Sequence, residues 1–193
     1  MQHSKHINRH SGGLTLIELL IVLSIVAIAT NIAAPAFVER INALRSASAM
    51  RHLATLLNFG RYHALTVNIP TTVCALDARR KCVRNWSREQ EIAVFVDGNG
   101  NHRLDPSELQ LRSIRWPMRG GELSWRASLA RPYIEFETTG GTWQNGTLYY
   151  CPDNRDARHA RSLVLSHSGR SYLPGDSNGD GIREDRHGRN LRC

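Results

Sequence analysis

The chain has 193 residues and a formal net charge of +8, and all but two of its 25 basic residues are arginine. An excess of arginine is compatible with an anionic partner. No internal repeat or low-complexity tract is present, which excludes a repeat array. Beyond one apolar segment near the N-terminus, roughly 150 residues remain, enough for a single compact domain.

That apolar segment runs from Leu14 to Ala34, and its only charged residue is Glu18. At about 1.5 Å of rise per residue it extends for roughly 31 Å as a helix, enough to cross the hydrocarbon core of a bilayer. A carboxylate inside such a span costs about 2.5–3.5 kcal/mol on insertion scales, so it normally marks a function. Residues 14–34 are therefore predicted to span a membrane, with a specific task for Glu18.

The preceding residues, 1–13, are polar and basic and end in Gly12-Gly13. A basic leader, a glycine and an apolar segment with an early glutamate resemble the N-terminus of a type IV prepilin. The resemblance implies that a prepilin peptidase cleaves between Gly13 and Leu14 and that Leu14 is then N-methylated. It also implies that Glu18, the fifth mature residue, guides filament assembly. The family usually has phenylalanine where this chain has Leu14.

Two other interpretations of the segment explain less. A secretory signal peptide has its small-residue cleavage site after the apolar stretch. Residues 33–36 imitate such a site but leave Glu18 unexplained, and a plain membrane anchor needs neither Gly13 nor Glu18. The basic leader predicts a single-pass protein of the inner membrane, with a cytoplasmic N-terminus and a periplasmic C-terminal head.

A helical pattern continues over residues 35–68. Pro35, the 22nd mature residue, stands where pilin helices commonly carry a kink-forming proline. Asn68 precedes Ile69 and Pro70, and this proline ends the helix because the residue before a proline is pushed out of helical geometry. We expect a sheet to cover the apolar stripe, which recurs at helical spacing at Phe37, Ile41, Leu44, Leu53, Leu56, Leu57 and Ala64.

Residues 69–193 have the alternation of β-strands, interrupted by turns rich in glycine and asparagine. The expected strands are 71–76, 91–96, 109–114, 122–125, 133–136, 148–151 and 162–166. The predicted fold class is α+β, with one long helix packed on the antiparallel β-sheet of a globular head. The resemblance to pilins implies that this is the pilin fold.

The chain has four cysteines, and export to an oxidising compartment favours disulfides. The favoured pairing is Cys74 with Cys82 and Cys151 with Cys193, because the first closes a short polar loop and the second ties the last residue to the head. Free structural thiols are the alternative. No C-x-x-C spacing or histidine cluster favours a metal site.

Several segments of the head narrow the resemblance to the FimT/GspH family of minor pseudopilins. They are residues 68–74, Trp86, residues 94–101 with Asp105 and Glu108, residues 146–151 and residues 163–170. Members are components of type II secretion pseudopili or minor pilins of type IV pili, and some FimT-like pilins bind DNA during uptake. The implied partners are other pilins or pseudopilins, the prepilin peptidase and, in the second case, DNA.

The C-terminal tail is rich in arginine, and FimT-like DNA-binding pilins carry a G-R-x-R motif in this region. Here residues 188–192 have one residue too many for the motif, and Gly169-Arg170 lacks the second arginine. We favour a solvated terminus held by the second disulfide. In the alternative, DNA binds to Arg170, Arg186, Arg189 and Arg192. A second basic cluster surrounds Trp86 and is either a surface loop or a contact with DNA or another subunit; it consists of Arg79, Arg80, Lys81, Arg84 and Arg88.

Residues 97–108 place oxygen side chains at EF-hand positions, among them Asp97, Asp105 and Glu108. The sixth position, however, is His102 instead of glycine, so we expect a hairpin turn and no calcium or other cofactor. Residues 176–181 resemble the start of a similar loop and are also expected to be a turn. No nucleophile elbow or metalloprotease spacing occurs, so a membrane-anchored periplasmic enzyme is a distant alternative.

Overall fold

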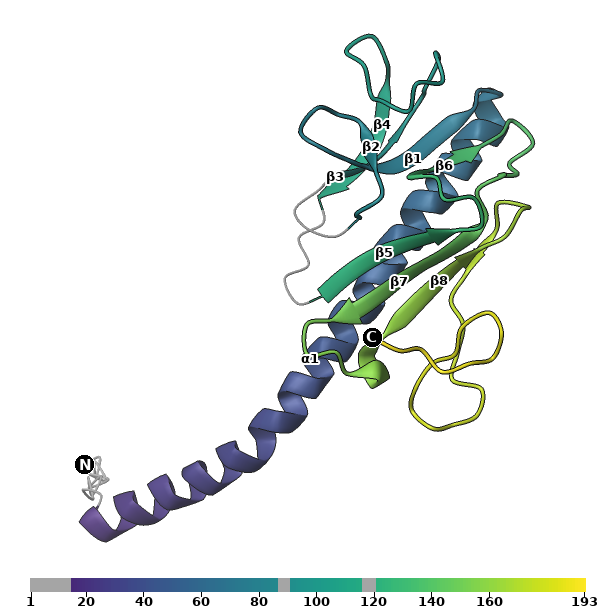
Figure 1. The fold of residues 1–193 in the computed structure, drawn as a ribbon. Coiled ribbons are helices and arrows are strands. Elements are labelled where there is room, and N and C mark those ends of the chain that lie inside the picture. The colour runs from purple at the N-terminus through teal and green to yellow at the C-terminus, as the bar shows by residue number, and fades with distance from the viewer. Residues whose placement is uncertain (1–14, 87–90, 116–120) are drawn as a thin grey trace, which may run out of the picture. The chain divides into compact units, whose positions relative to one another are not determined.

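The computed structural model describes residues 15–86, 91–115 and 121–193, and the chain divides into two compact units, Met1–Arg40 and Ile41–Cys193. One helix, α1 (Leu16–Val67), belongs to both units (Figure 1). The expected cleavage site at Gly13 and Leu14 lies outside the described residues.

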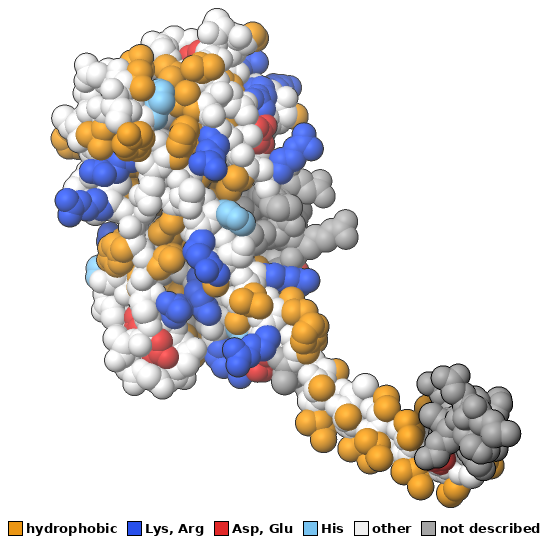
Figure 2. Space-filling model, turned by 180° about the vertical axis from the view of Figure 1, so that it is seen from behind, with side chains coloured by type: hydrophobic (Ala, Val, Ile, Leu, Met, Phe, Trp, Pro, Cys, Tyr) orange, Lys and Arg blue, Asp and Glu red, His pale blue; other side chains and the backbone are white. Residues whose placement is uncertain are grey.

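In the first unit the described residues 16–40 form a helical segment. Among the described residues, α1 is the one helix that is long and apolar enough to cross a membrane. In this segment the large apolar side chains are exposed, with Leu16 at 78% and Ile32 at 72%, and Figure 2 shows hydrophobic side chains along its length. An apolar surface of this extent is unfavourable in water, so the segment is consistent with a membrane anchor.

The second unit contains two antiparallel sheets. In the first sheet β1 (Thr71–Leu76) pairs with β3 (Glu91–Phe95), and β3 pairs with β4 (Gln110–Arg115). The other side of β1 pairs with both β2 (Cys82–Val83) and β6 (Tyr133–Phe136). The second sheet has the order β5 (Gly121–Ala127), β7 (Gly146–Pro152), β8 (Arg161–Leu165), β9 (Ser171–Tyr172).

The fold class expected from the sequence is confirmed. All seven expected strands are present, with ends shifted by at most two residues. The sequence did not predict β2, β9 or the single turn of 3₁₀-helix η1 (Ala157–His159). A two-residue strand is too short for an alternating pattern, so its pairing depends on neighbours that are distant in the sequence.

The C-terminal half of α1 runs behind both sheets (Figure 1) and buries one stripe of side chains against them. The buried apolar residues of this stripe are Ala49, Met50, Leu53, Leu56, Leu57 and Ala64. Gly60 lies in the same stripe, where an added Cβ would be 3.0 Å from Val73 of β1. The absent side chain therefore lets helix and sheet approach closely. Leu44, which the sequence pattern placed in the stripe, is 63% exposed.

The helix is also tied to two turns of the head by Arg61. Its Nε donates to the carbonyl oxygen of Gly140, before β7, at 3.0 Å and to that of Ser168, after β8, at 3.3 Å. Between the sheets, the rings of Trp86 and Trp125 lie 6.1 Å apart in the core. These contacts join α1 and both sheets into one hydrophobic core.

Candidate functional site

Glu18 lies in the first turn of α1. The hydroxyl of Thr15 accepts a hydrogen bond from the Glu18 N–H at 3.3 Å, as an N-terminal cap does. A carboxylate at this end of a helix is stabilised by the helix dipole. Within the described residues, Glu18 has no ion-pair partner, and the next charged residue along the helix is Glu39. The geometry thus presents one carboxylate at the start of an exposed apolar helix.

The helix continues through position 35, so Pro35 does not end it. The side chain of Pro35 lies outside the described residues, and the kink stays a prediction.

The cysteines pair as the spacing favours, Cys74 with Cys82 and Cys151 with Cys193, and the Cα atoms are 5.5 Å apart in each pair. The first bond lies inside the core and closes the turn between β1 and β2. The second joins β7 to Cys193, and the disulfide sulfur of Cys151 also lies 3.8 Å from the carbonyl oxygen of Arg192. The tail therefore returns to the second sheet.

The residues that follow β9 form an ordered loop. The carboxylate of Glu184 is buried and accepts the N–H groups of Ser177 and Asn178. Asp185 pairs with Arg189 at 2.8 Å. Burial raises the pKa of the Asp185 carboxyl, but hydrogen bonds from Arg189 lower it, and the net direction is downward. The expected solvated terminus is therefore a folded one, in which Glu184 and Asp185 are engaged in hydrogen bonds.

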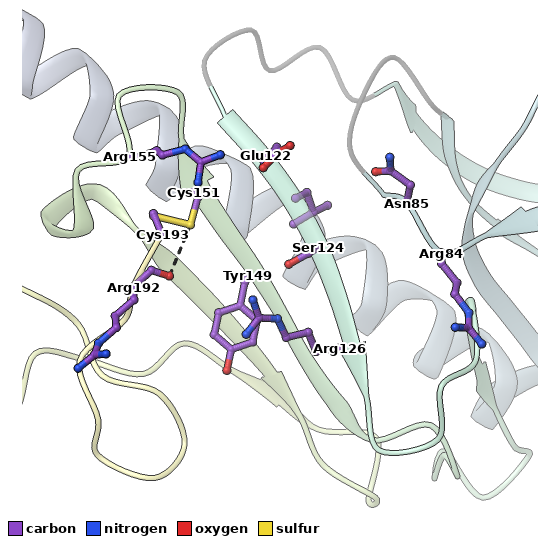
Figure 3. Close-up of a pocket in the computed structure, with 11 residues that line it drawn as sticks. Arg84, Asn85, Glu122, Ser124, Arg126, Tyr149, Cys151, Arg155, Arg192 and Cys193 are labelled. Atoms are coloured by element: carbon purple, nitrogen blue, oxygen red, sulfur yellow. Dashed lines mark hydrogen bonds between the residues drawn. A yellow bond between two sulfur atoms is a disulfide. The ribbon is translucent and has the colours of Figure 1, made fainter.

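Two cavities lie on the second sheet beside this tail. The first, of about 320 Å³, is shown in Figure 3, and its charged lining residues are Arg84, Glu122, Arg126, Arg155 and Arg192. The second, of about 210 Å³, has the basic lining residues Arg126, Arg186, His187 and Arg189. Tyr149 lines both cavities, and the guanidinium of Arg126 lies 4.6 Å from the centre of its ring.

The structure thus divides the arginines that the sequence grouped as a DNA-binding set. Arg186, Arg189 and Arg192 line these cavities, whereas Arg170 lies in the turn between β8 and β9 and lines neither. Sequence reasoning missed Arg126, Arg155 and Tyr149. The alternation of buried Leu123 and Trp125 along β5, which puts Arg126 on the opposite face, was the available signal.

The second basic cluster is also divided. Trp86 is fully buried and donates from Nε1 to the carbonyl oxygen of Pro132 at 3.2 Å, so it is a core residue and not a surface contact. Arg80 pairs with Glu91 at 2.6 Å. Of this cluster, Arg84 lines the larger cavity.

In residues 97–108 the side-chain oxygens accept hydrogen bonds from the loop itself. Asp97 Oδ2 accepts the N–H of His102 at 2.9 Å, and Glu108 Oε1 accepts that of Gly98 at 3.0 Å. The segment has the geometry of a tight, self-bonded turn. Among the described residues there is no group of three or more histidine, cysteine, aspartate or glutamate side chains arranged to hold a metal ion. The absence of calcium stays a prediction.

Comparison with known proteins gives two family matches. The model of the type II transport protein GspH matches residues 49–169, and that of the prokaryotic N-terminal methylation motif matches residues 8–30. No curated protein matches the chain.

Solved structures with a similar fold include the type IV minor pilin FimU of Pseudomonas aeruginosa. In one crystal form it is 19% identical, with a TM-score of 0.53 over 73% of this chain and 94% of FimU. The minor pseudopilin EpsH from the type 2 secretion system of Vibrio cholerae is 10% identical, with a TM-score of 0.48 over 69% of this chain and 98% of EpsH.

The GspH match covers more than half of the chain and includes α1 from position 49 and every strand of the two sheets except β9. The methylation motif includes Gly13 and Glu18. The family consists of structural pilin subunits and not of enzymes, in agreement with the absence of a catalytic motif from the sequence. The chain is a member of the GspH family of minor pilins and pseudopilins, with a prepilin-type N-terminal methylation motif.

Proposed function

We propose that this chain is a minor subunit of a periplasmic filament, either a type II secretion pseudopilus or a type IV pilus. It enters the inner membrane as a prepilin through residues 14–34 and keeps its head in the periplasm. The prepilin peptidase cleaves it between Gly13 and Leu14, and Leu14 is methylated. It then acts by assembly with other pilins or pseudopilins.

The observation that carries this proposal is the position of Glu18, a single carboxylate in the first turn of an exposed apolar helix. Where such helices pack side by side, an unpaired carboxylate is costly. Cleavage creates an α-ammonium group at residue 14, and this group on a neighbouring subunit neutralises Glu18. The same contact draws the subunit from the lipid in a defined register.

Replacing Glu18 with alanine is expected to leave membrane insertion unchanged but to reduce incorporation into the filament by at least about a hundredfold. Loss of one partner of a buried ion pair costs about 3–5 kcal/mol, and each 1.4 kcal/mol is a factor of ten. The measurement is the amount of the variant that co-purifies with its filament partners, relative to its amount in the membrane fraction.

The matched control is Ser24→Ala, because Ser24 is also a polar residue of this helix but its hydroxyl donates to the carbonyl oxygen of Leu20. This variant should be incorporated normally. Normal co-purification of Glu18→Ala would contradict the proposal. The partners recovered with the wild-type chain identify which of the two filament systems it serves.

A second candidate function, DNA binding, is favoured by the tail arginines. Arg186, Arg189 and Arg192 line cavities beside the second sheet, in a tail that a disulfide joins to β7. Arginines held in this way match the phosphates of a DNA backbone, and such binding weakens as salt rises because counterions are released. Binding of labelled DNA by the full chain in detergent at several salt concentrations tests this function.

A further inference from the structure

The outer face of the second sheet carries a basic surface that extends beyond the tail. Leu123 and Trp125 of β5 and Tyr150 of β7 are buried toward the core. Side chains in alternate positions point to the other face, so Arg126 and Tyr149 lie there together. Their strands are in register, with Ser124 opposite Tyr149, and the guanidinium of Arg126 reaches over the ring.

The two cavities are adjacent because they share Arg126 and Tyr149. We call the two together the basic strip. Its arginines come from the segment after β2, from β5, from the segment after β7 and from the tail: Arg84, Arg126, Arg155, Arg186, Arg189 and Arg192. Figure 3 shows Arg126 over Tyr149, with Arg155 and Arg192 on either side of the disulfide.

The charge of the strip is poorly compensated. The only acidic lining residue among those described is Glu122. Arg189 pairs with Asp185, but in the part of the chain that the structure describes no carboxylate lies within ion-pair distance of the other five arginines. Like charges held together repel one another, and an anionic ligand relieves this repulsion.

The form of the strip favours a linear polyanion over a small anion. A guanidinium group can bind either a phosphate or a carboxylate through two parallel N–H···O hydrogen bonds. One small anion fills one cavity, whereas two adjacent cavities with a shared arginine suit a ligand with repeated charges. An aromatic ring beside such a basic groove is the combination found in nucleic-acid sites.

We propose that the basic strip on β5 and β7 binds the phosphodiester backbone of DNA, and that the Cys151–Cys193 disulfide assembles it by holding the tail arginines beside Arg126. This assignment rests on the DNA-binding function proposed above. It moves the centre of the site from the tail to the sheet, to Arg126 and Tyr149, and it excludes Arg170. Recognition is through the backbone, so binding depends little on the base sequence.

The test uses the full chain in detergent micelles and the fluorescence anisotropy of a labelled oligonucleotide, single-stranded or as a duplex of the same sequence. Arg126→Gln should weaken binding about tenfold and reduce the slope of log affinity against log salt by about 0.7–0.9, the loss of one phosphate contact. Arg170→Gln makes the same chemical change outside the strip and should leave both quantities unchanged. The form that binds more tightly shows whether the strip takes single-stranded or duplex DNA.

The role of the disulfide is tested with Cys193→Ser, which frees the tail from β7. Binding should weaken at least as much as in Arg192→Gln, while circular dichroism in the far ultraviolet stays unchanged. Equal affinity of Cys193→Ser and the wild type would overturn the assembling role of the disulfide.

The remaining outcomes separate the two proposals. Absence of salt-dependent binding by the wild type would refute the DNA-binding function itself. Normal salt-dependent binding with no loss in Arg126→Gln would keep that function and overturn the basic strip as its site. Binding of a polyglutamate peptide in preference to both forms of DNA would identify an acidic protein as the occupant and would also overturn the assignment.

Discussion

Gly169→Ala is expected to lower the free energy of unfolding of the head by about 2–5 kcal/mol. Gly169 has φ +71°, in the left-handed region that costs a residue with a Cβ about 1–2 kcal/mol. A Cβ at this position would also be 2.0 Å from the carbonyl oxygen of Gly140 and 3.0 Å from Nε of Arg61. The backbone must therefore move where Arg61 joins the helix to two turns, which adds a strain of about 1–3 kcal/mol.

Two glycines serve as controls for this effect. Gly179 has a similar φ of +78°, but no atom lies within 4 Å of an added Cβ, so Gly179→Ala should cost only about 1–2 kcal/mol. Gly98 has neither a positive φ nor a close neighbour, and Gly98→Ala should change the stability by less than about 0.5 kcal/mol. Denaturant titration followed by tryptophan fluorescence measures all three. Equal losses for Gly169→Ala and Gly179→Ala would contradict the proposed clash.

Leu53→Ala is expected to destabilise the head by about 2–5 kcal/mol, the usual cost of the cavity and the lost burial. Leu53 is fully buried in the stripe of α1 that faces the sheets. For a domain of this size the midpoint of thermal unfolding should fall by roughly 2–4 °C for each kcal/mol. Thermal unfolding of the full chain in detergent, followed by near-ultraviolet circular dichroism, measures the shift.

Leu44→Ala is the matched control, with the same chemical change in the same helix. Because Leu44 is 63% exposed, its truncation should change the stability by less than about 0.5 kcal/mol. A loss in Leu44→Ala as large as that in Leu53→Ala would show that the exposed side chain is covered in the protein as purified. Both results depend on which turns of α1 are covered by the sheets. The periodicity of the sequence alone does not show this.

Sequence reasoning predicted the helix and the longer strands well because each has a local cause. The apolar repeat and Pro70 set the limits of α1, and alternation set those of strands such as β1 and β6. The two-residue strands were missed because a pair of residues carries no period. Leu44 was wrongly assigned to the core. Helical spacing shows which residues share one face of a helix, but it does not show how far along the helix a sheet covers that face.

The candidate sites also differ in whether local sequence or tertiary structure identifies them. Glu18 was identifiable from the sequence, since a lone carboxylate in an apolar segment is a local anomaly. The tail arginines were visible as a charged run, but Arg126 and Tyr149 were not. They come from two strands with other residues between them, and only the pairing of β5 with β7 brings them together.

The sequence alone therefore determined that this protein has an apolar helical segment with one carboxylate, polar and basic residues before it, and a β-rich head with four cysteines. Those features depend on composition, period and spacing, which act over a few residues. Only the tertiary structure decided that Trp86 belongs to the core, that Arg170 is separate from the tail arginines and that the strip centres on β5 and β7. These depend on strand register and on a covalent bond between residues 151 and 193, which join parts of the chain that are distant in sequence.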